Sequence, residues 1–198
     1  MQVEKLNTQT ARRMGQVPRG TVRIENRSKA PDALVFRVFE DVLSRGLARG
    51  ATAFIPRTTV RATASSGYRR AGYYKPGVYI HERARHLVRV TFPDQWEAFS
   101  WPSISLGLVG AAYYLARQFY AVTVHEFTHL SDSLIGANFA RADSGSRRPA
   151  HDTRPEEIRA NAAEAQYSYN PAILDDLAAW FYDAHADETR RMQPYVKD

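Results

Sequence analysis

Residues 105–135 read SLGLVGAAYYLARQFYAVTVHEFTHLSDSLI, and this stretch carries the longest regular pattern in the chain. Its apolar side chains recur at three- and four-residue steps, at Leu108, Ala111, Ala112, Leu115, Phe119, Val122 and Leu130. This spacing predicts one long amphipathic helix. Gly136 follows it directly and is typical of a helix end. The rest of the fold is therefore expected to pack around this helix.

The region before the long helix is rich in strand patterns. Residues 21–26 (TVRIEN) alternate apolar and polar side chains, and residues 59–63 are mostly β-branched or apolar. Residues 77–82 (GVYIHE) and 87–92 (LVRVTF) predict two strands joined by a short turn. These patterns together predict a small antiparallel or mixed sheet.

Three other segments near the sheet have different patterns. An early helix is predicted to begin at Pro31-Asp32 and to end at Gly46 or Gly50, with its apolar side chains on one face. Residues 96–102 are aromatic and contain Pro102, which predicts a loop. Residues 1–19 are polar without a clear period, which predicts a flexible N-terminal arm.

Two further helices are expected after the long one. The first covers residues 154–166, and the second begins at Pro171 with Asn170 as its cap. Residues 140–152 between the long helix and these two predict a loop. The expected fold class is α+β, with residues 20–198 forming a single domain.

Composition limits the classes of site and partner. The 198 residues include no cysteine, so a metal ion has only His, Asp and Glu as strong ligands. The net charge of +6 raises nucleic acid as a partner, but the arginine pairs are scattered and do not favour it. The N-terminus has no apolar leader, and no apolar run is long enough to span a bilayer. A cytoplasmic protein without a membrane partner is expected, and the sequence does not set its oligomeric state.

The long helix contains the run His125-Glu126-Phe127-Thr128-His129, an H-E-x-x-H motif. Residues four apart lie on one helix face, so both imidazoles can reach one metal ion. Glu126 is turned about a third of the way round the helix and can reach a metal-bound water without being a ligand. The motif therefore predicts a zinc site with Glu126 as general base.

A catalytic zinc needs a third protein ligand and an open fourth position. The downstream candidates are Asp132, Asp143, His151, Asp152, Glu156, Glu157 and Glu164. Thr153 and Glu156 have the spacing of a capping box, which gives Glu156 a local role and leaves Glu157 available. Glu157 is therefore the favoured ligand and His151 the rival. Asn161, four residues after Glu157, is a candidate to hydrogen-bond a ligand histidine.

The HEFTH run, taken together with EIRAN at residues 157–161, resembles the gluzincin group of metallopeptidases. In that group a second helix supplies a glutamate as the third zinc ligand. The resemblance implies a zincin-like fold, with His125, His129 and Glu157 as zinc ligands and Glu126 as catalytic base. The chain departs from the group at Asn161, where an aspartate is usual.

The expected function is hydrolysis of peptide bonds in a peptide or protein substrate. His151, Tyr167 and Tyr169 are candidate hydrogen-bond donors to the oxyanion, with packing at a helix end as the alternative for the tyrosines. The resemblance implies that an edge strand near the zinc binds an extended peptide, and residues 87–92 are the favoured strand. Three other functions remain open: a DNA-associated protease, a zinc-binding module without catalysis, and a hydrolase of other amides.

Overall fold

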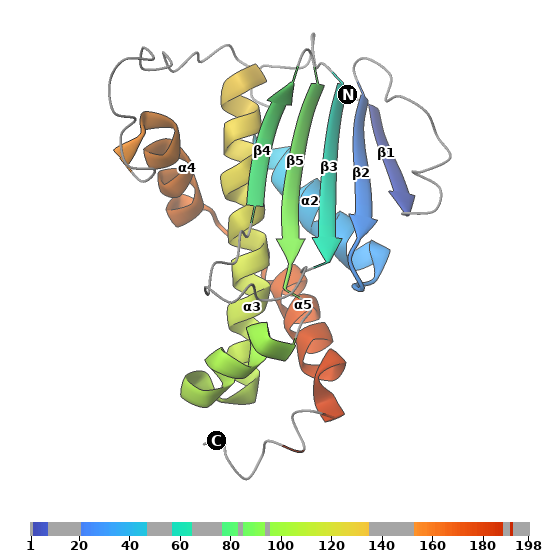
Figure 1. The fold of residues 1–198 in the computed structure, drawn as a ribbon, viewed down its shortest axis with the longest axis vertical. Helices are drawn as coiled ribbons and strands as arrows, with labels where there is room; N and C mark the ends of the chain where they lie inside the picture. Colours follow the sequence, from blue (N-terminus) through green and yellow to red (C-terminus); the bar gives the residue numbers. More distant parts are fainter. Residues whose placement is uncertain are drawn as a thin grey trace.

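A mixed sheet and four helices make up the part of the chain that the computed structural model describes (Figure 1). That part comprises residues 2–7, 21–46, 57–64, 77–82, 85–93, 96–134, 153–187 and 191. The strands are β1 (Gln2–Asn7), β2 (Thr21–Arg27), β3 (Arg57–Ala64), β4 (Gly77–Glu82) and β5 (Arg85–Phe92). The helices are α2 (Asp32–Gly46), α3 (Trp96–Leu134), α4 (Pro155–Gln166) and α5 (Pro171–Ala184). The order of elements confirms an α+β fold.

The strands lie in the order β1-β2-β3-β5-β4. Neighbouring strands are parallel except β4, which pairs antiparallel with β5, for example Ile80 with Leu87. This pairing confirms the predicted hairpin. However, β5 is an interior strand, because it also pairs with β3, as Val88 does with Val60. The prediction that residues 87–92 form the edge strand is therefore wrong, and β4 occupies that edge.

The N-terminal segment differs from the expected flexible arm over its described part. Gln2–Asn7 forms β1 and pairs in parallel with β2, with Lys5 opposite Ile24. Lys5 Nζ also lies 2.5 Å from Glu40 Oε1 of α2. The polar sequence of β1 has no strong strand pattern. This segment is a strand because its backbone pairs with β2. Residues 8–20 lie outside the described part.

Helix α2 has the predicted bounds and the predicted buried face. Its core side chains are Leu34, Val35, Val38, Phe39, Val42 and Leu43. Asn26, at the end of β2, fixes the entry into α2, because its side-chain amide donates to Ala30 O (2.7 Å) and to Asp32 Oδ1 (2.9 Å). Figure 1 shows α2 and α3 behind the sheet, with α3 beside β4 and β5.

Helix α3 is longer than predicted, because the expected aromatic loop at residues 96–102 is helical. This segment buries Phe99 and Ala98 in the core, and that burial outweighs the helix-breaking tendency of Pro102. The helix breaks at Gly107, where φ is 70° and ψ is 176°. Only glycine adopts this conformation readily, so Gly107 separates the aromatic segment from the helix that carries the HEFTH motif.

The core lies where the sheet, α3 and α5 meet. The Phe92 ring lies 4.7 Å from the Phe119 ring and 5.0 Å from the Phe181 ring between centroids. These three side chains are essentially inaccessible to solvent. Despite the length of α3, the structure contains no described helix that is both long and apolar enough to span a bilayer.

Candidate metal centre

The HEFTH motif lies on α3, where one face of the helix is buried in the core and another is partly exposed. Phe127 and Leu130 are buried, and the Phe127 ring lies 5.9 Å from the Phe39 ring of α2. His125 and His129 are on the other side, with side chains 17% and 12% exposed. Burial of the apolar side therefore fixes the rotation of α3 and turns both histidines toward α4.

Helix α4 brings Glu157 to the histidines. Glu157 and Ala160 are the buried residues of this helix, and the small Ala160 side chain lets α4 approach α3 closely. The N-cap is Arg154, without a side-chain capping bond, so the predicted Thr153 capping box is wrong. Pro155 begins the helix because its fixed φ suits the first turn and no N–H is needed there.

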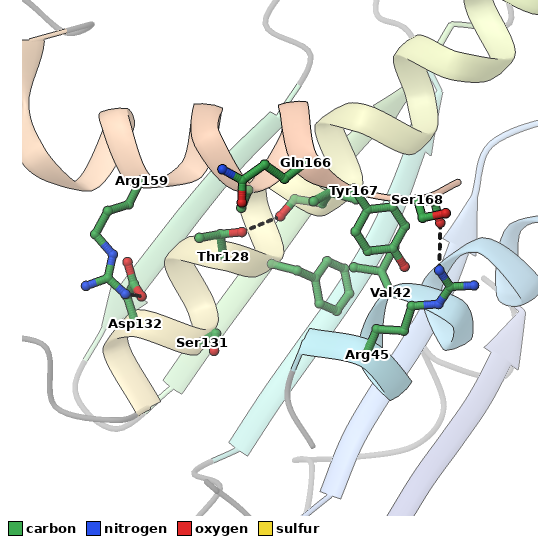
Figure 2. Close-up of a pocket in the computed structure, with 12 residues that line it drawn as sticks. Val42, Arg45, Thr128, Ser131, Asp132, Arg159, Gln166, Tyr167 and Ser168 are labelled. Carbon is green, nitrogen blue, oxygen red and sulfur yellow. Dashed lines mark hydrogen bonds and ion pairs between the residues drawn. The ribbon is translucent and has the colours of Figure 1, made fainter. Parts of the chain in front are cut away.

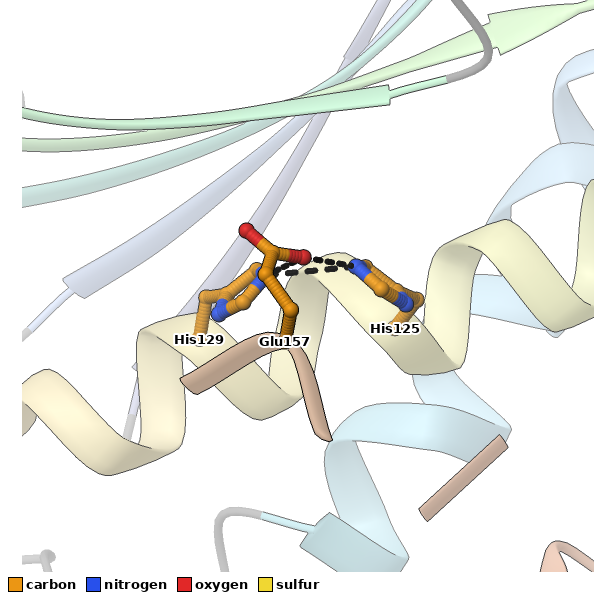
Figure 3. A group of neighbouring side chains, drawn as sticks. All are labelled: His125, His129 and Glu157. Atoms are coloured by element: carbon orange, nitrogen blue, oxygen red, sulfur yellow. Dashed lines mark hydrogen bonds and ion pairs between the residues drawn. The ribbon is translucent and has the colours of Figure 1, made fainter. Parts of the chain in front are cut away.

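Three ligand atoms converge between the two helices, as Figure 3 shows. His125 Nε2 lies 3.2 Å from His129 Nε2 and 3.2 Å from Glu157 Oε2. His129 Nε2 lies 3.4 Å from the same carboxylate oxygen. Ligands at about 2.0 to 2.1 Å from a tetrahedral zinc lie roughly 3.3 to 3.4 Å from one another. The triangle therefore has the size of one face of a zinc coordination tetrahedron.

The three atoms are also of the chemical types that bind a cation. Each neutral imidazole nitrogen without a proton and each carboxylate oxygen offers a lone pair. One metal ion can accept all three lone pairs at once, whereas a single proton can join only two of these atoms. Burial is the largest influence on His129 and lowers its pKa, which favours the neutral form that a metal requires. The group is therefore able to bind a metal ion.

Glu126 lies next to this group without belonging to it. Its side chain is buried, with the residue 7% exposed. Burial, and next the negative charge of Glu157, raise the pKa of Glu126 to about 8. A group whose pKa lies near neutrality is suited to taking up and releasing a proton.

A second polar contact joins α4 to α3 beyond His129. Arg159 donates to Asp132 Oδ1 at 2.6 Å, and Figure 2 shows the two side chains meeting between the helices. They line one end of a pocket between α2, α3 and α4, and Arg45 and Tyr167 line the other end. None of the three ligand residues lines this pocket, so it is separate from the candidate metal centre.

The other predicted site residues lie away from the triad or outside the described part. Asn161 is exposed on α4. Tyr167 donates to Asp41 Oδ2 of α2 at 2.9 Å, and Tyr169 donates to Glu164 O at 3.3 Å. These bonds support the packing role of both tyrosines, and the described contacts give no support to the oxyanion role. His151 lies outside the described residues, so its rival role as third ligand stays a prediction.

Sequence reasoning missed three partners of the site. Asp132 and Glu164 are predicted from the sequence only as candidate ligands, and no role is predicted for Arg159. Glu164 Oε2 lies 3.7 Å from His125 Nδ1. Its place seven residues after Glu157, on the same helix face, is the signal that would have found it.

Comparisons with protein-family models, with curated proteins and with solved structures gave no match to this chain. The interpretation of the site therefore depends on its own residues and geometry.

Proposed function

We propose that this chain is a zinc-dependent metallopeptidase with a zincin-like arrangement. The observation that carries the proposal is the triangle of His125, His129 and Glu157, with buried Glu126 beside it. Two nitrogen ligands and one carboxylate oxygen are a common set in catalytic zinc sites, which keep a fourth position open. The partial exposure of both histidines is consistent with such an open position.

Each residue of the site then has a distinct task. His125, His129 and Glu157 hold the ion, which when bound supplies a Lewis acid that acidifies water and polarises a carbonyl oxygen. Glu126 accepts the proton of the attacking water and transfers it to the leaving amine. Glu126 is suited to both steps because it directly follows the ligand His125 on α3 and can reach a metal-bound water without being a ligand itself.

The sheet supports a peptide as the substrate. Strand β4 borders α3, and its outer edge pairs with no other strand in the described part of the chain. An extended peptide can add to such an edge through main-chain hydrogen bonds. We therefore assign to β4 the substrate-binding role first predicted for residues 87–92. The resemblance to gluzincins implies an edge strand near the metal site, so the place of β4 beside α3 supports the proposed zincin-like arrangement.

The test combines metal content with hydrolysis of a mixed peptide library. We expect one zinc per wild-type chain and hydrolysis of library members. Glu157→Ala is expected to lose the zinc and the activity together. Glu126→Gln is expected to keep the zinc and to lose at least about 100-fold in kcat/KM, because only the proton transfer is removed.

Three results would contradict the proposal. A wild-type chain that takes up no zinc would exclude the metal site. Full activity of Glu126→Gln with zinc bound would exclude the general base. Zinc binding without hydrolysis of any library member would leave a zinc-binding module or a hydrolase of other amides.

A further inference from the structure

We propose that Glu164 is the positioning residue of His125, in place of the aspartate that Asn161 replaces. When a metal ion is bound to Nε2, the Glu164 carboxylate moves closer, accepts a hydrogen bond from the Nδ1–H group of His125 and fixes the orientation of the ring. This inference rests on the metal site proposed above, because the orientation matters only when Nε2 is a ligand.

The two nitrogens of His125 face different groups. Nε2 faces His129 and Glu157, at 3.2 Å from each partner atom. Nδ1 lies 3.7 Å from Glu164 Oε2. A neutral imidazole that gives its Nε2 lone pair to a metal carries its proton on Nδ1. The proton therefore lies on the nitrogen that faces the Glu164 carboxylate.

The distance of 3.7 Å is longer than a hydrogen bond, and the Glu164 side chain can shorten it. This side chain is 39% exposed, so it is free to rotate toward the ring. His125 is 17% exposed and is held by the buried helix α3. Adjustment is thus expected in Glu164 rather than in the ligand.

The backbone of Glu164 is anchored, although its side chain is partly exposed. Its carbonyl oxygen accepts bonds from Tyr167 N and from the Tyr169 hydroxyl, both at 3.3 Å. The Tyr169 ring packs edge-on against Tyr120, with centroids 5.2 Å apart, and Tyr120 is fully buried. The last turn of α4 is therefore tied to the core, which keeps the Glu164 carboxylate beside the ring.

Helix geometry explains why Glu164 takes this role instead of Asn161. At about 100° per residue, Glu164 is roughly 20° from the direction of Glu157 on α4, whereas Asn161 is roughly 40° away on the other side. The structure agrees, because Asn161 is exposed. A carboxylate also supplies the negative charge that makes the histidine a stronger ligand, which an amide does not.

The experiment measures the zinc dissociation constant by competition with a chromophoric chelator. We expect Glu164→Ala to weaken zinc binding about 10- to 100-fold, the usual effect of losing such a partner. Glu164→Gln is expected to fall between Glu164→Ala and the wild type, because it keeps an acceptor without the charge. Asn161→Ala and Glu156→Gln, on the same helix, are the matched controls and should bind zinc like the wild type.

Two spectroscopic measurements separate positioning from a general loss of structure. The absorption of the cobalt-loaded protein should keep the intensity of a tetrahedral site in Glu164→Gln. Nitrogen NMR of the zinc-loaded wild type should find the His125 proton on Nδ1. These measurements keep the inference testable even if Glu164→Ala does not fold.

The outcomes distinguish this inference from the proposed function. Tight zinc binding by the wild type with no weakening in either Glu164 variant overturns the role of Glu164 and leaves the metal site intact. Weakening by Asn161→Ala instead assigns the role to Asn161. Absence of zinc binding in the wild type overturns both proposals.

Discussion

Helices α4 and α5 both pack against α3, but they do so through different chemistry. Helix α5 buries Ile173, Leu177, Ala178 and Phe181. Helix α4 buries only Glu157 and Ala160. The contacts of α4 with α3 are largely charged, with Glu157 and Glu164 facing histidines and Arg159 facing Asp132.

This difference separates α5, which stabilises the fold, from α4, which carries residues of the candidate metal site. Apolar side chains gain from burial without any further partner. A buried carboxylate is costly until a cation compensates its charge. The packing of α5 is therefore complete in the chain itself, whereas the buried carboxylate of α4 is left for the proposed metal ion to compensate.

The largest expected effect is on the α5 contact. Phe181→Ala removes a fully buried ring that stacks on Phe92, and we expect the free energy of unfolding to fall by about 3 to 5 kcal/mol. Denaturant titration of the metal-free protein measures it. Tyr182→Ala on the same helix is the control, because Tyr182 is exposed and should change the value by less than about 1 kcal/mol. Equal effects of the two variants would mean that α5 does not depend on its buried apolar face.

Removal of the metal is expected to act on α4 alone. In hydrogen exchange, amides of α4 should exchange roughly 100-fold faster after chelation, which corresponds to about 2.7 kcal/mol of lost local stability. Amides of α5 should keep their rates, because its contacts are apolar. A comparable acceleration in both helices would mean that the ion supports the whole core.

A smaller effect is expected from Glu126 in the metal-free protein. Its pKa is raised from an ordinary 4.5 to about 8, so the folded state holds the proton more tightly than the unfolded state. The resulting stability is complete below pH 4.5 and is lost as the pH rises through 8. The Glu126→Gln variant has no carboxyl group that can ionise at this position, so its stability should not fall in this way as the pH rises. The full shift would correspond to roughly 5 kcal/mol. Because the metal-free site can open locally around the ionised carboxylate, we expect the variant to equal the wild type near pH 4 and to exceed it by only about 2 kcal/mol near pH 9.

Denaturant titration in the presence of chelator at several pH values measures this difference. Glu156→Gln, on the less buried side of α4, should show no such rise with pH. A constant difference between Glu126→Gln and the wild type across the pH range would contradict the burial of an ionising Glu126.

The smallest expected effect concerns the contact of Arg159 with Asp132. Arg159 is half exposed, so solvent screens the pair, and Arg159→Gln should cost about 0.5 to 1 kcal/mol of unfolding free energy. A double-mutant cycle with Asp132→Asn isolates the coupling between the two side chains. A coupling energy of zero would mean that this ion pair does not stabilise the contact between α4 and α3, and that the contact depends mainly on the candidate metal ligands.

The sequence predicted the parts of this molecule that have a strong local pattern. The helix carrying HEFTH, the early helix, the hairpin and both C-terminal helices follow from apolar periodicity and from signals such as Asn170, whose side chain accepts a bond from Ala172 N. The meeting of His125, His129 and Glu157 was predicted from four-residue spacing and a resemblance.

The remaining features depend on contacts between distant segments. The polar sequence of β1 becomes a strand by pairing with β2, and β5 becomes interior by pairing with β3. The helix at residues 96–102 forms because Phe99 is buried. The approach of Glu164 to His125 depends on how α4 crosses α3. The spacing of Glu164 from Glu157 places it on the right face of α4, but none of the other contacts is encoded in a local pattern, so sequence periodicity alone could not predict them.

The residues of the candidate metal site come from distant parts of the chain. His125 and Glu157 are 32 positions apart, and the chain has no cysteine with which to cross-link these regions. The proposed metal ion makes that cross-link only in the folded state, so the strength of the link follows the concentration of free metal. At a free zinc concentration of about 100 times Kd, the link contributes about 2.7 kcal/mol. On the proposed function, the stability of the molecule therefore responds to the zinc supply, much as that of a disulfide-bonded protein responds to the redox potential around it.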